Sequence, residues 1–200
     1  KTGTTAIQNF LAKNHPKLIE QGILYPHTGR FSENSNNHLP LFLSMCERPQ
    51  LIQTPIVEPA LPAPVYTRLL QTEIDAYGAH TVILSCETLF MPAFDEASLE
   101  RIKSSLDFGH ITILAVLRDQ ATMLESGFAQ RVSGPQRFAG TAKEHYDMQE
   151  ARGALDYEPR LSEFEAVFDQ DQLHVVWYEE IREDILKPIR DISRIDENRA

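Results

Sequence analysis

Helical and strand-like segments alternate along most of this chain, and that alternation constrains the fold more than any other feature of the sequence. Apolar residues recur at helical spacing over 65–77, and the largely apolar run over 81–85 is typical of a strand buried on both faces. The same rhythm continues through a helix, a strand, two helices, a strand and a last helix, at 96–107, 111–117, 121–132, 155–168, 173–178 and from residue 184. The sequence therefore predicts an α/β fold in which helices flank a mostly parallel sheet.

Length and charge limit the kinds of protein that this chain can be. Two hundred residues with ordinary hydrophobic content suit one domain, over 1–200. The net charge of -10 leaves no basic face that could follow a nucleic-acid backbone or an anionic membrane. The two cysteines, Cys46 and Cys86, and the seven histidines show no metal-ligand spacing, so no metal site is expected. Unpaired cysteines, without a visible signal peptide or membrane-spanning stretch, favour a cytoplasmic location.

The chain opens with five residues that are typical of a phosphate-binding loop: Lys1, Thr2, Gly3, Thr4 and Thr5. A helix is predicted from Thr4, because apolar residues recur at positions 7, 10 and 11. A glycine and two hydroxyl residues at a helix entrance direct backbone N–H groups, hydroxyl donors and the positive end of the helix dipole at one anion. Lys1 adds a full positive charge. Taken alone, the segment could equally be a threonine-rich helix cap that binds nothing.

A second candidate anion site follows the predicted strand 111–117. Parallel sheets bind ligands beyond the carboxyl ends of their strands, and Arg118 stands at such an end. Ser126 lies eight residues further on, inside the next predicted helix, and an arginine fork with a hydroxyl at this spacing can close on one phosphate. The ordinary alternative for Arg118 is a surface ion pair with Asp119 or Glu125.

Together these two segments resemble the donor site of the sulfotransferases that use 3′-phosphoadenosine-5′-phosphosulfate (PAPS). The 5′-phosphosulfate loop of that family places its lysine before the glycine, as here, whereas the common nucleotide-binding loop places it after the second glycine. The family's 3′-phosphate site is similar to Arg118 and Ser126 in order and spacing. Segments 22–26, 84–87 and 175–179 also resemble sulfotransferases of bacterial and Golgi carbohydrate type, so the likeness covers nearly the whole chain.

The resemblance implies a three-layer, P-loop-like fold and transfer of a sulfuryl group from PAPS to a hydroxyl acceptor, with a sugar or glycan expected as the acceptor and no metal needed. Lys1 would neutralise charge on the bridging oxygen, the rest of the loop would hold the 5′-phosphosulfate, and Arg118 with Ser126 would hold the 3′-phosphate. The strand that should lead into Lys1 is missing from the sequence. We therefore expect a fragment, incomplete at the N-terminus and possibly at the C-terminus.

Two residues are candidates for the base that removes the acceptor proton, since sulfotransferase subfamilies use either a glutamate or a histidine in this role. Glu87 follows a predicted buried strand, where partial desolvation would make its carboxylate a better base. His38 follows a polar loop and is expected to titrate near neutral pH without help. The alternatives are a helix-capping role for Glu87 and a solvent-facing loop position for His38. We favour Glu87.

Two other functions are compatible with such a chain. A P-loop kinase or other NTP-dependent phosphotransferase would share the architecture, but it needs a glycine-lysine-hydroxyl order and a magnesium-binding acid, for which Glu87 is the sequence's candidate. A non-catalytic nucleotide-binding remnant would keep the fold and the nucleotide site without transferring any group.

Overall fold

The computed structural model describes residues 3–30, 36–52, 61–134 and 137–195. The strands are β1 Ile23–Leu24, β2 Thr81–Val82, β3 Ile113–Leu117 and β4 Leu173–Trp177. The α-helices are α1 Thr4–Lys13, α2 His15–Ile19, α3 Leu39–Leu43, α4 Ala63–Tyr77, α5 Glu96–Ser105, α6 Gln120–Ser133, α7 Ala142–Glu150, α8 Glu158–Val167, α9 Tyr178–Ile181 and α10 Lys187–Ser193. Three 3₁₀ turns complete the described structure: η1 Pro49–Leu51, η2 Glu87–Phe90 and η3 Gln170–Gln172.

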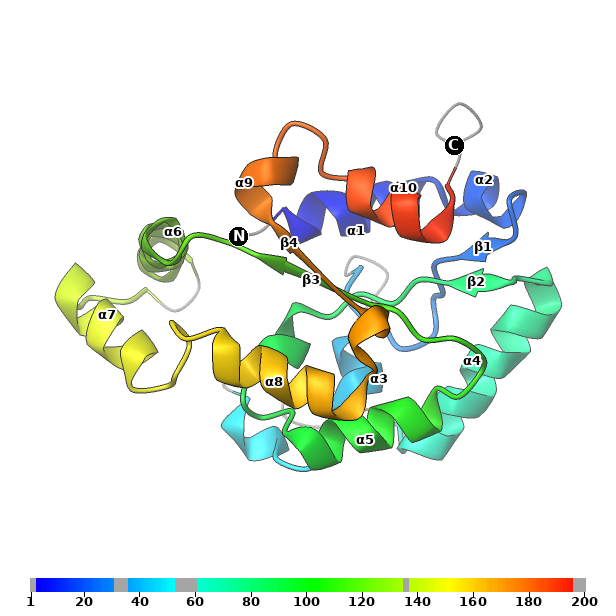
Figure 1. The fold of residues 1–200 in the computed structure, drawn as a ribbon, viewed down its shortest axis with the longest axis horizontal. Coiled ribbons are helices and arrows are strands. Elements are labelled where there is room, and N and C mark those ends of the chain that lie inside the picture. The colour runs from blue at the N-terminus through cyan, green and yellow to red at the C-terminus, as the bar shows by residue number, and fades with distance from the viewer. Residues whose placement is uncertain (1–2, 31–35, 53–60, 135–136, 196–200) are drawn as a thin grey trace.

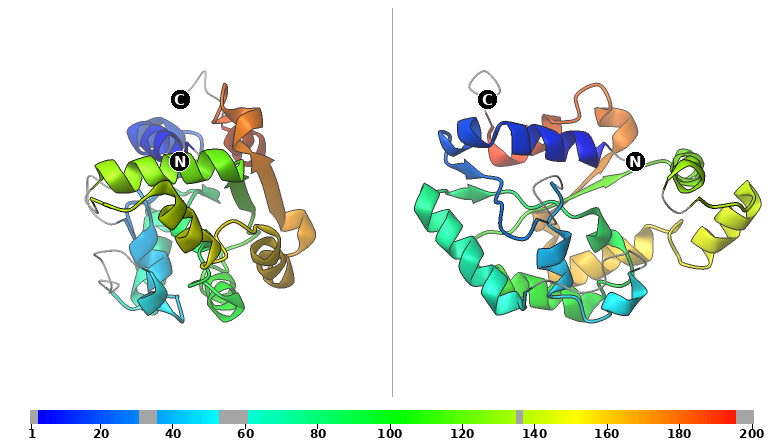
Figure 2. Two further views of the ribbon diagram at one scale, coloured as in Figure 1. Left: turned by 90° about the vertical axis from the view of Figure 1, so that its left-hand side faces the viewer. Right: turned by 180° about the vertical axis from the view of Figure 1, so that it is seen from behind.

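The strands form a middle layer between two layers of helices (Figure 1). Helices α1, α2 and α10 lie on one side of the strands, and α3, α4, α5 and α8 lie on the other. The turned views show the same separation, with α6 and α7 standing off at one end of the molecule (Figure 2). This is the layered α/β architecture that the alternating sequence predicts.

Two pairs of parallel strands make up the middle layer. β1 pairs with β2, and β3 pairs with β4 over five residues, in a register that sets Leu117 opposite Trp177. The continuous sheet expected from the sequence is therefore present in the described residues as two separate two-stranded sheets. Parallel pairing of strands far apart in the chain requires the helical crossovers that separate them.

Both strand pairs lie between the same two hydrophobic clusters. The cluster against α3, α4, α5 and α8 includes Val82 and Ile113, whereas the cluster against α1, α2 and α10 includes Ile83 and Leu114. Consecutive residues of a strand point to opposite faces, so each pair separates the two clusters in the same way. The two small sheets therefore share one layer.

Three differences from the predicted elements have local causes. α7 is a helix that the apolar pattern does not predict, and Thr141 and Glu144 start it with a reciprocal capping box. The expected strand over 81–85 is shorter, as β2, although the Ile83 N–H still donates to the Leu24 carbonyl at 2.9 Å. The expected last helix, from residue 184, is present as α10, and the short α9 before it was not predicted. None of the described helices has the length and apolar character needed to cross a membrane.

Candidate functional site

The entrance of α1 is shaped by a glycine whose backbone conformation other residues adopt only with strain. Gly3 precedes the helix in the left-handed region, with φ of 72°, and a Cβ built on it would lie 1.7 Å from Cδ1 of Ile185 and 3.3 Å from Cε2 of Tyr178. The Gly3 carbonyl accepts from the N–H groups of Ala6 and Ile7. The first two helical residues, Thr4 and Thr5, precede these bonds, so their N–H groups point out of the helix entrance.

Lys1 and Thr2, the other predicted members of this loop, lie outside the described residues. Their roles stay predictions. Gly3, Thr4 and Thr5 are described, and their position at the start of a ten-residue helix matches the entrance that the sequence predicts. Gly3 has no side chain with which to cap the helix, so its own side chain leaves the positive helix end uncapped.

Glu87 lies directly against this helix entrance. It begins η2, the turn that follows the β2 segment, and its Oε1 accepts a hydrogen bond from the Thr4 hydroxyl. The structure thus brings together two residues 83 positions apart that the sequence assigned to donor binding and to proton removal. Glu87 is exposed, which differs from the partly desolvated carboxylate expected from the sequence.

His38 occupies a different environment from the one expected. It is completely buried, its Nε2 lies 3.0 Å from the Pro26 carbonyl, and its Nδ1 accepts from the Ser85 N–H at 3.2 Å. These contacts fix a neutral ring that donates from Nε2 to a carbonyl. Burial lowers the pKa of His38 to about 4, so it does not titrate near neutrality as the sequence suggested. His38 connects the backbones of two loops in the core.

Arg118 and Ser126 converge at the opposite end of the site. Arg118 directly follows the last residue of β3. Its Nη1 donates to the Ser126 hydroxyl at 3.4 Å, and its Nε donates to the Thr122 hydroxyl at 3.1 Å. The guanidinium also stacks over the ring of Tyr178, 5.1 Å from its centroid. The predicted pairing of a guanidinium with a hydroxyl eight residues away is therefore present.

Acidic neighbours hold Arg118 and its helix in place. Asp119 caps α6 by accepting from the Thr122 N–H at 3.0 Å, and its own N–H donates to Glu179 at 3.3 Å. Glu179 also forms a long ion pair with Arg118, with 4.0 Å between Oε1 and Nε. The sequence considered Asp119 and Glu125 as ion-pair partners of Arg118, whereas the carboxylate of Glu179 comes from a strand end 61 residues away.

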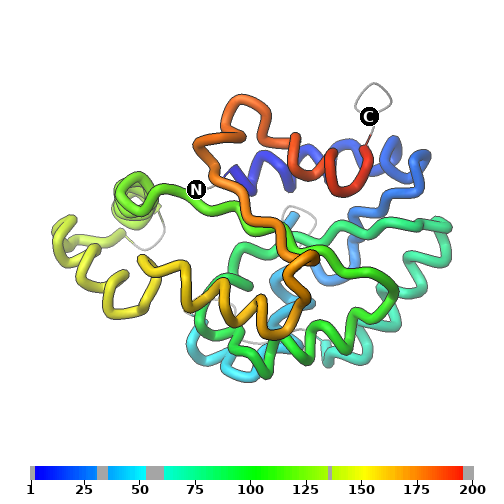
Figure 3. Tube along the Cα trace, in the orientation of Figure 1, coloured from blue at the N-terminus to red at the C-terminus, as the bar shows by residue number. Residues whose placement is uncertain are grey.

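Tyr178 joins the two ends of the site, and sequence reasoning did not assign it this role. Its ring lies beside Gly3 at the α1 entrance and beneath the Arg118 guanidinium. The tube trace shows why, since the chain passes from β4 into α9 next to the start of α1 and close to the turn from β3 into α6 (Figure 3). The available signal was the position of Tyr178 at a strand end, on the sheet edge where Arg118 also lies.

The arrangement can bind a ligand that carries two separated anionic groups. One group would meet the open entrance of α1, the other would meet Arg118 and Ser126, and the Glu87 carboxylate would lie at the first of these positions. Within the described ranges, no three His, Cys, Asp or Glu side chains lie close enough to hold a metal ion.

Comparisons with known proteins identify the fold. The sequence matches no protein-family model and no curated protein. The structure is similar to the crystal structure of a sulfotransferase from Alicyclobacillus acidocaldarius, with a TM-score of 0.58 and 16% sequence identity, over 96% of this chain and 75% of that chain. At this identity the likeness establishes a common fold, which agrees with the layered α/β fold expected from the sequence.

Proposed function

We propose that this protein is a sulfotransferase that moves a sulfuryl group from PAPS to a hydroxyl acceptor. The observation that carries the proposal is the position of the Tyr178 ring, which lies beside Gly3 and under the Arg118 guanidinium and so brings two segments more than 110 residues apart to one region. PAPS has a phosphosulfate at its 5′ end and a phosphate at its 3′ end, so it offers an anion to each segment. The sulfotransferase-like fold supports the same assignment.

The donor would be held at both ends by fixed positive groups. Gly3, Thr4 and Thr5 would donate to the 5′-phosphosulfate together with Thr2, and Arg118 and Ser126 would bind the 3′-phosphate. Lys1 would stabilise the charge that develops on the oxygen bridging sulfur and phosphorus. Such preorganised donors provide electrostatic stabilisation without a metal, and we propose that none is needed.

Glu87 is the proposed base. The acceptor oxygen attacks sulfur, its proton passes to the Glu87 carboxylate, and the bond between sulfur and the bridging oxygen breaks to release adenosine 3′,5′-bisphosphate. The contact between Glu87 and Thr4 supports this choice, because the carboxylate lies beside the loop proposed to hold the 5′-phosphosulfate. The buried, doubly bonded ring of His38 is unsuited to meet an acceptor. A sugar or glycan acceptor rests on the resemblance described for the sequence.

The finer fold proposal is a P-loop-like arrangement in which the two strand pairs belong to one mostly parallel sheet. The common orientation of the pairs toward the two hydrophobic clusters supports it, because both pairs lie in the same layer. The cytoplasmic location stays a prediction from the cysteine usage.

Nucleotide binding without magnesium tests the proposed function. Titration calorimetry should show adenosine 3′,5′-bisphosphate binding more tightly than adenosine 5′-monophosphate, which lacks the 3′-phosphate, and PAPS should sulfate members of a panel of sugars. A response to Mg-ATP that ignores the 3′-phosphate would indicate the phosphotransferase alternative. Nucleotide binding without sulfuryl transfer to any sugar or to water would indicate the non-catalytic remnant.

A further inference from the structure

The first turn of α8 contacts both ends of the candidate site. Tyr157, which immediately precedes α8, donates its hydroxyl to the Arg118 carbonyl at 2.8 Å. The same hydroxyl lies 3.3 Å from Sδ of Met123 on α6. Arg118 begins the turn between β3 and α6, so this bond ties the backbone of the proposed 3′-phosphate site to α8.

Arg160, in the first turn of α8, contacts the segment that carries Glu87. Its side chain is only 6% exposed, and its Nη2 donates to the Leu89 carbonyl at 2.6 Å. Leu89 belongs to η2, the single turn that Glu87 begins. Glu163 on the same helix pairs with the Arg160 guanidinium, which balances its charge. A buried guanidinium is costly to desolvate, so its bonds strongly favour one position of the carbonyl that it contacts.

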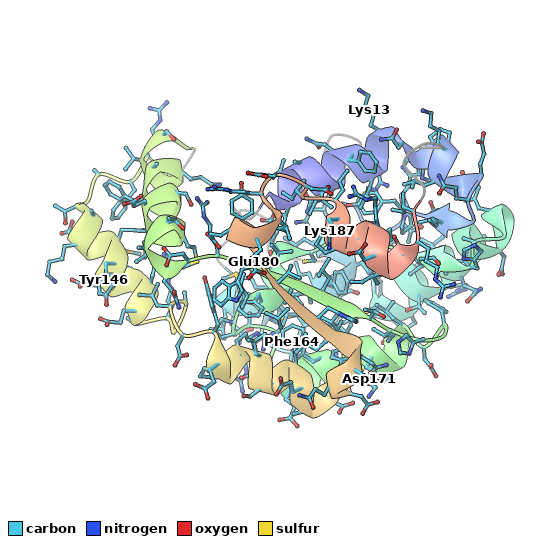
Figure 4. All side chains as sticks on the ribbon, turned by 45° about the horizontal axis from the view of Figure 1, so that its top comes forward. Lys13, Tyr146, Phe164, Asp171, Glu180 and Lys187 are labelled. Carbon is cyan, nitrogen blue, oxygen red and sulfur yellow. The ribbon has the colours of Figure 1, made fainter. Side chains whose placement is uncertain are left out.

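An aromatic stack connects these two contacts. The ring of Phe90, the last residue of η2, lies 5.9 Å from the Tyr157 ring and 6.1 Å from the Phe164 ring. Arg160 stacks on Phe164, with 4.6 Å between the guanidinium carbon and the ring centroid. Figure 4 shows Phe164 among the side chains between α8 and the strands. The turn η2 is thus held by α8 on both its backbone and its aromatic side chain.

We infer that Tyr157 and Arg160 are positioning residues that fix the separation between Glu87 and Arg118. The inference rests on the proposed function, because it gives these two residues the proton-accepting and 3′-phosphate roles. Tyr157 acts through the Arg118 backbone and Arg160 acts through the Leu89 carbonyl. A misplacement of about 1 Å at a reacting centre can cost about 100-fold in rate, so a rigid connection between the two groups has a direct catalytic consequence.

Tyr157→Phe tests the first half of the inference, because it removes one hydroxyl and keeps the ring. Affinity for adenosine 3′,5′-bisphosphate should fall by about 5-fold, while affinity for adenosine 5′-monophosphate should change by less than about twofold. In an Arg118→Ala background the same substitution should cause no further loss. Tyr146→Phe is the matched control, since Tyr146 donates to Glu150 on α7, far from α8 in Figure 4.

Arg160→Gln tests the second half. The rate of sulfuryl transfer from PAPS, to a sugar of the panel or to water, should fall by about 10-fold or more, while bisphosphate affinity stays within about twofold. In a Glu87→Gln background Arg160→Gln should cause no additional loss of rate. Glu163→Gln removes the ion-pair partner but leaves the bond to Leu89, and it should preserve most of the rate.

Defined results would overturn the inference. Equal losses for both nucleotides in Tyr157→Phe, or full additivity with Arg118→Ala, would show that Tyr157 supports only the general structure. Equal losses of rate and bisphosphate affinity in Arg160→Gln would show the same for Arg160. If the unsubstituted protein does not prefer the bisphosphate, the proposed function fails and this inference fails with it. If that preference is present and Tyr157→Phe retains it in full, only the inference fails.

Discussion

The entrances of α1 and α6 are the two helix ends at the candidate site, and the structure completes them in opposite ways. Asp119 caps α6 with its side chain and occupies the Thr122 N–H, whereas Gly3 precedes α1 with no side chain at all. The donors of α6 are thus used within the protein, and its anion site depends on the Arg118 guanidinium. At α1 no side chain of Gly3 uses the N–H donors, and the Thr4 hydroxyl donates to Glu87. In the proposed site, the 3′-phosphate would therefore be held by side chains, whereas the 5′-phosphosulfate would meet backbone N–H groups together with threonine hydroxyls.

The largest expected effect concerns the α1 side of this comparison, where Glu87 is the proposed base. Glu87→Gln should slow sulfuryl transfer from PAPS by about 10²- to 10⁴-fold, because it removes the base, and should leave bisphosphate affinity within about twofold. Rates and calorimetry on the same preparation separate the two effects. Exposed Glu180→Gln on α9 is the control. A rate close to that of the unsubstituted protein would contradict the assignment of Glu87, at the α1 entrance, as the base.

The second prediction concerns His38, whose burial distinguishes it from Glu87. Because the fold favours the neutral ring, with a pKa of about 4 against an ordinary value of 6.5, this group contributes its stability fully above pH 6.5. That contribution, roughly 3 kcal/mol, is lost as the pH falls from 6.5 through 4, where the unfolded chain binds a proton that the folded chain resists. Urea unfolding at several pH values should show a smaller acid-induced loss for His38→Gln. An equal loss in both proteins would contradict the prediction.

Arg118→Ala tests the α6 side of the comparison, because it removes the guanidinium proposed to bind the 3′-phosphate. Loss of a charged hydrogen-bond donor to phosphate should weaken binding of adenosine 3′,5′-bisphosphate by about 10- to 100-fold and affect adenosine 5′-monophosphate little. Arg68→Ala, at an exposed position on α4, controls for the loss of one positive charge. Unchanged bisphosphate affinity in Arg118→Ala would show that the 3′-phosphate is bound elsewhere.

The smallest expected effect concerns the Asp119 side-chain cap, which α6 has and α1 lacks. Asp119→Ala should cost about 1 kcal/mol in the free energy of unfolding, because the Thr122 N–H loses its acceptor. Thr141→Ala, which removes the cap of α7, should cost a similar amount without altering nucleotide affinity. Chemical denaturation measures both. If Asp119→Ala leaves the free energy of unfolding unchanged, the hydrogen bond from the Thr122 N–H to Asp119 does not stabilise the α6 entrance.

The sequence predicted the elements with strong periodicity and the contact between two candidate residues that are close together in the chain. The apolar run over 111–117 gave β3, and the eight-residue interval between Arg118 and Ser126 gave their contact, because a strand end followed by a helix has few geometries. α7 was missed, since its helix is mostly exposed and shows its capping box more clearly than an apolar face.

Contacts between distant segments were beyond the sequence. The position of Tyr178 between Gly3 and Arg118 depends on the packing of α9 beside α1, and the burial of His38 depends on the backbones at Pro26 and Ser85, which its ring contacts. A polar residue that directly follows a polar loop gives no sign of such burial. Glu87 combines a predicted feature with unpredicted ones, because its position after a strand was predicted while its exposure and its bond to Thr4 were not.

The tight fit around Gly3 has a consequence for selection experiments. In a library of substitutions at position 3, every side chain would require an unfavourable left-handed backbone, and its Cβ would also require the end of the Ile185 side chain to move. A screen for cellular abundance alone should therefore deplete all variants at this position, even where no sulfuryl donor is supplied. Thr5, which is exposed one residue into the helix, should tolerate change in that screen and respond only to a screen for activity. The pair of screens would separate the steric demand of the fold from the chemical demand of the ligand.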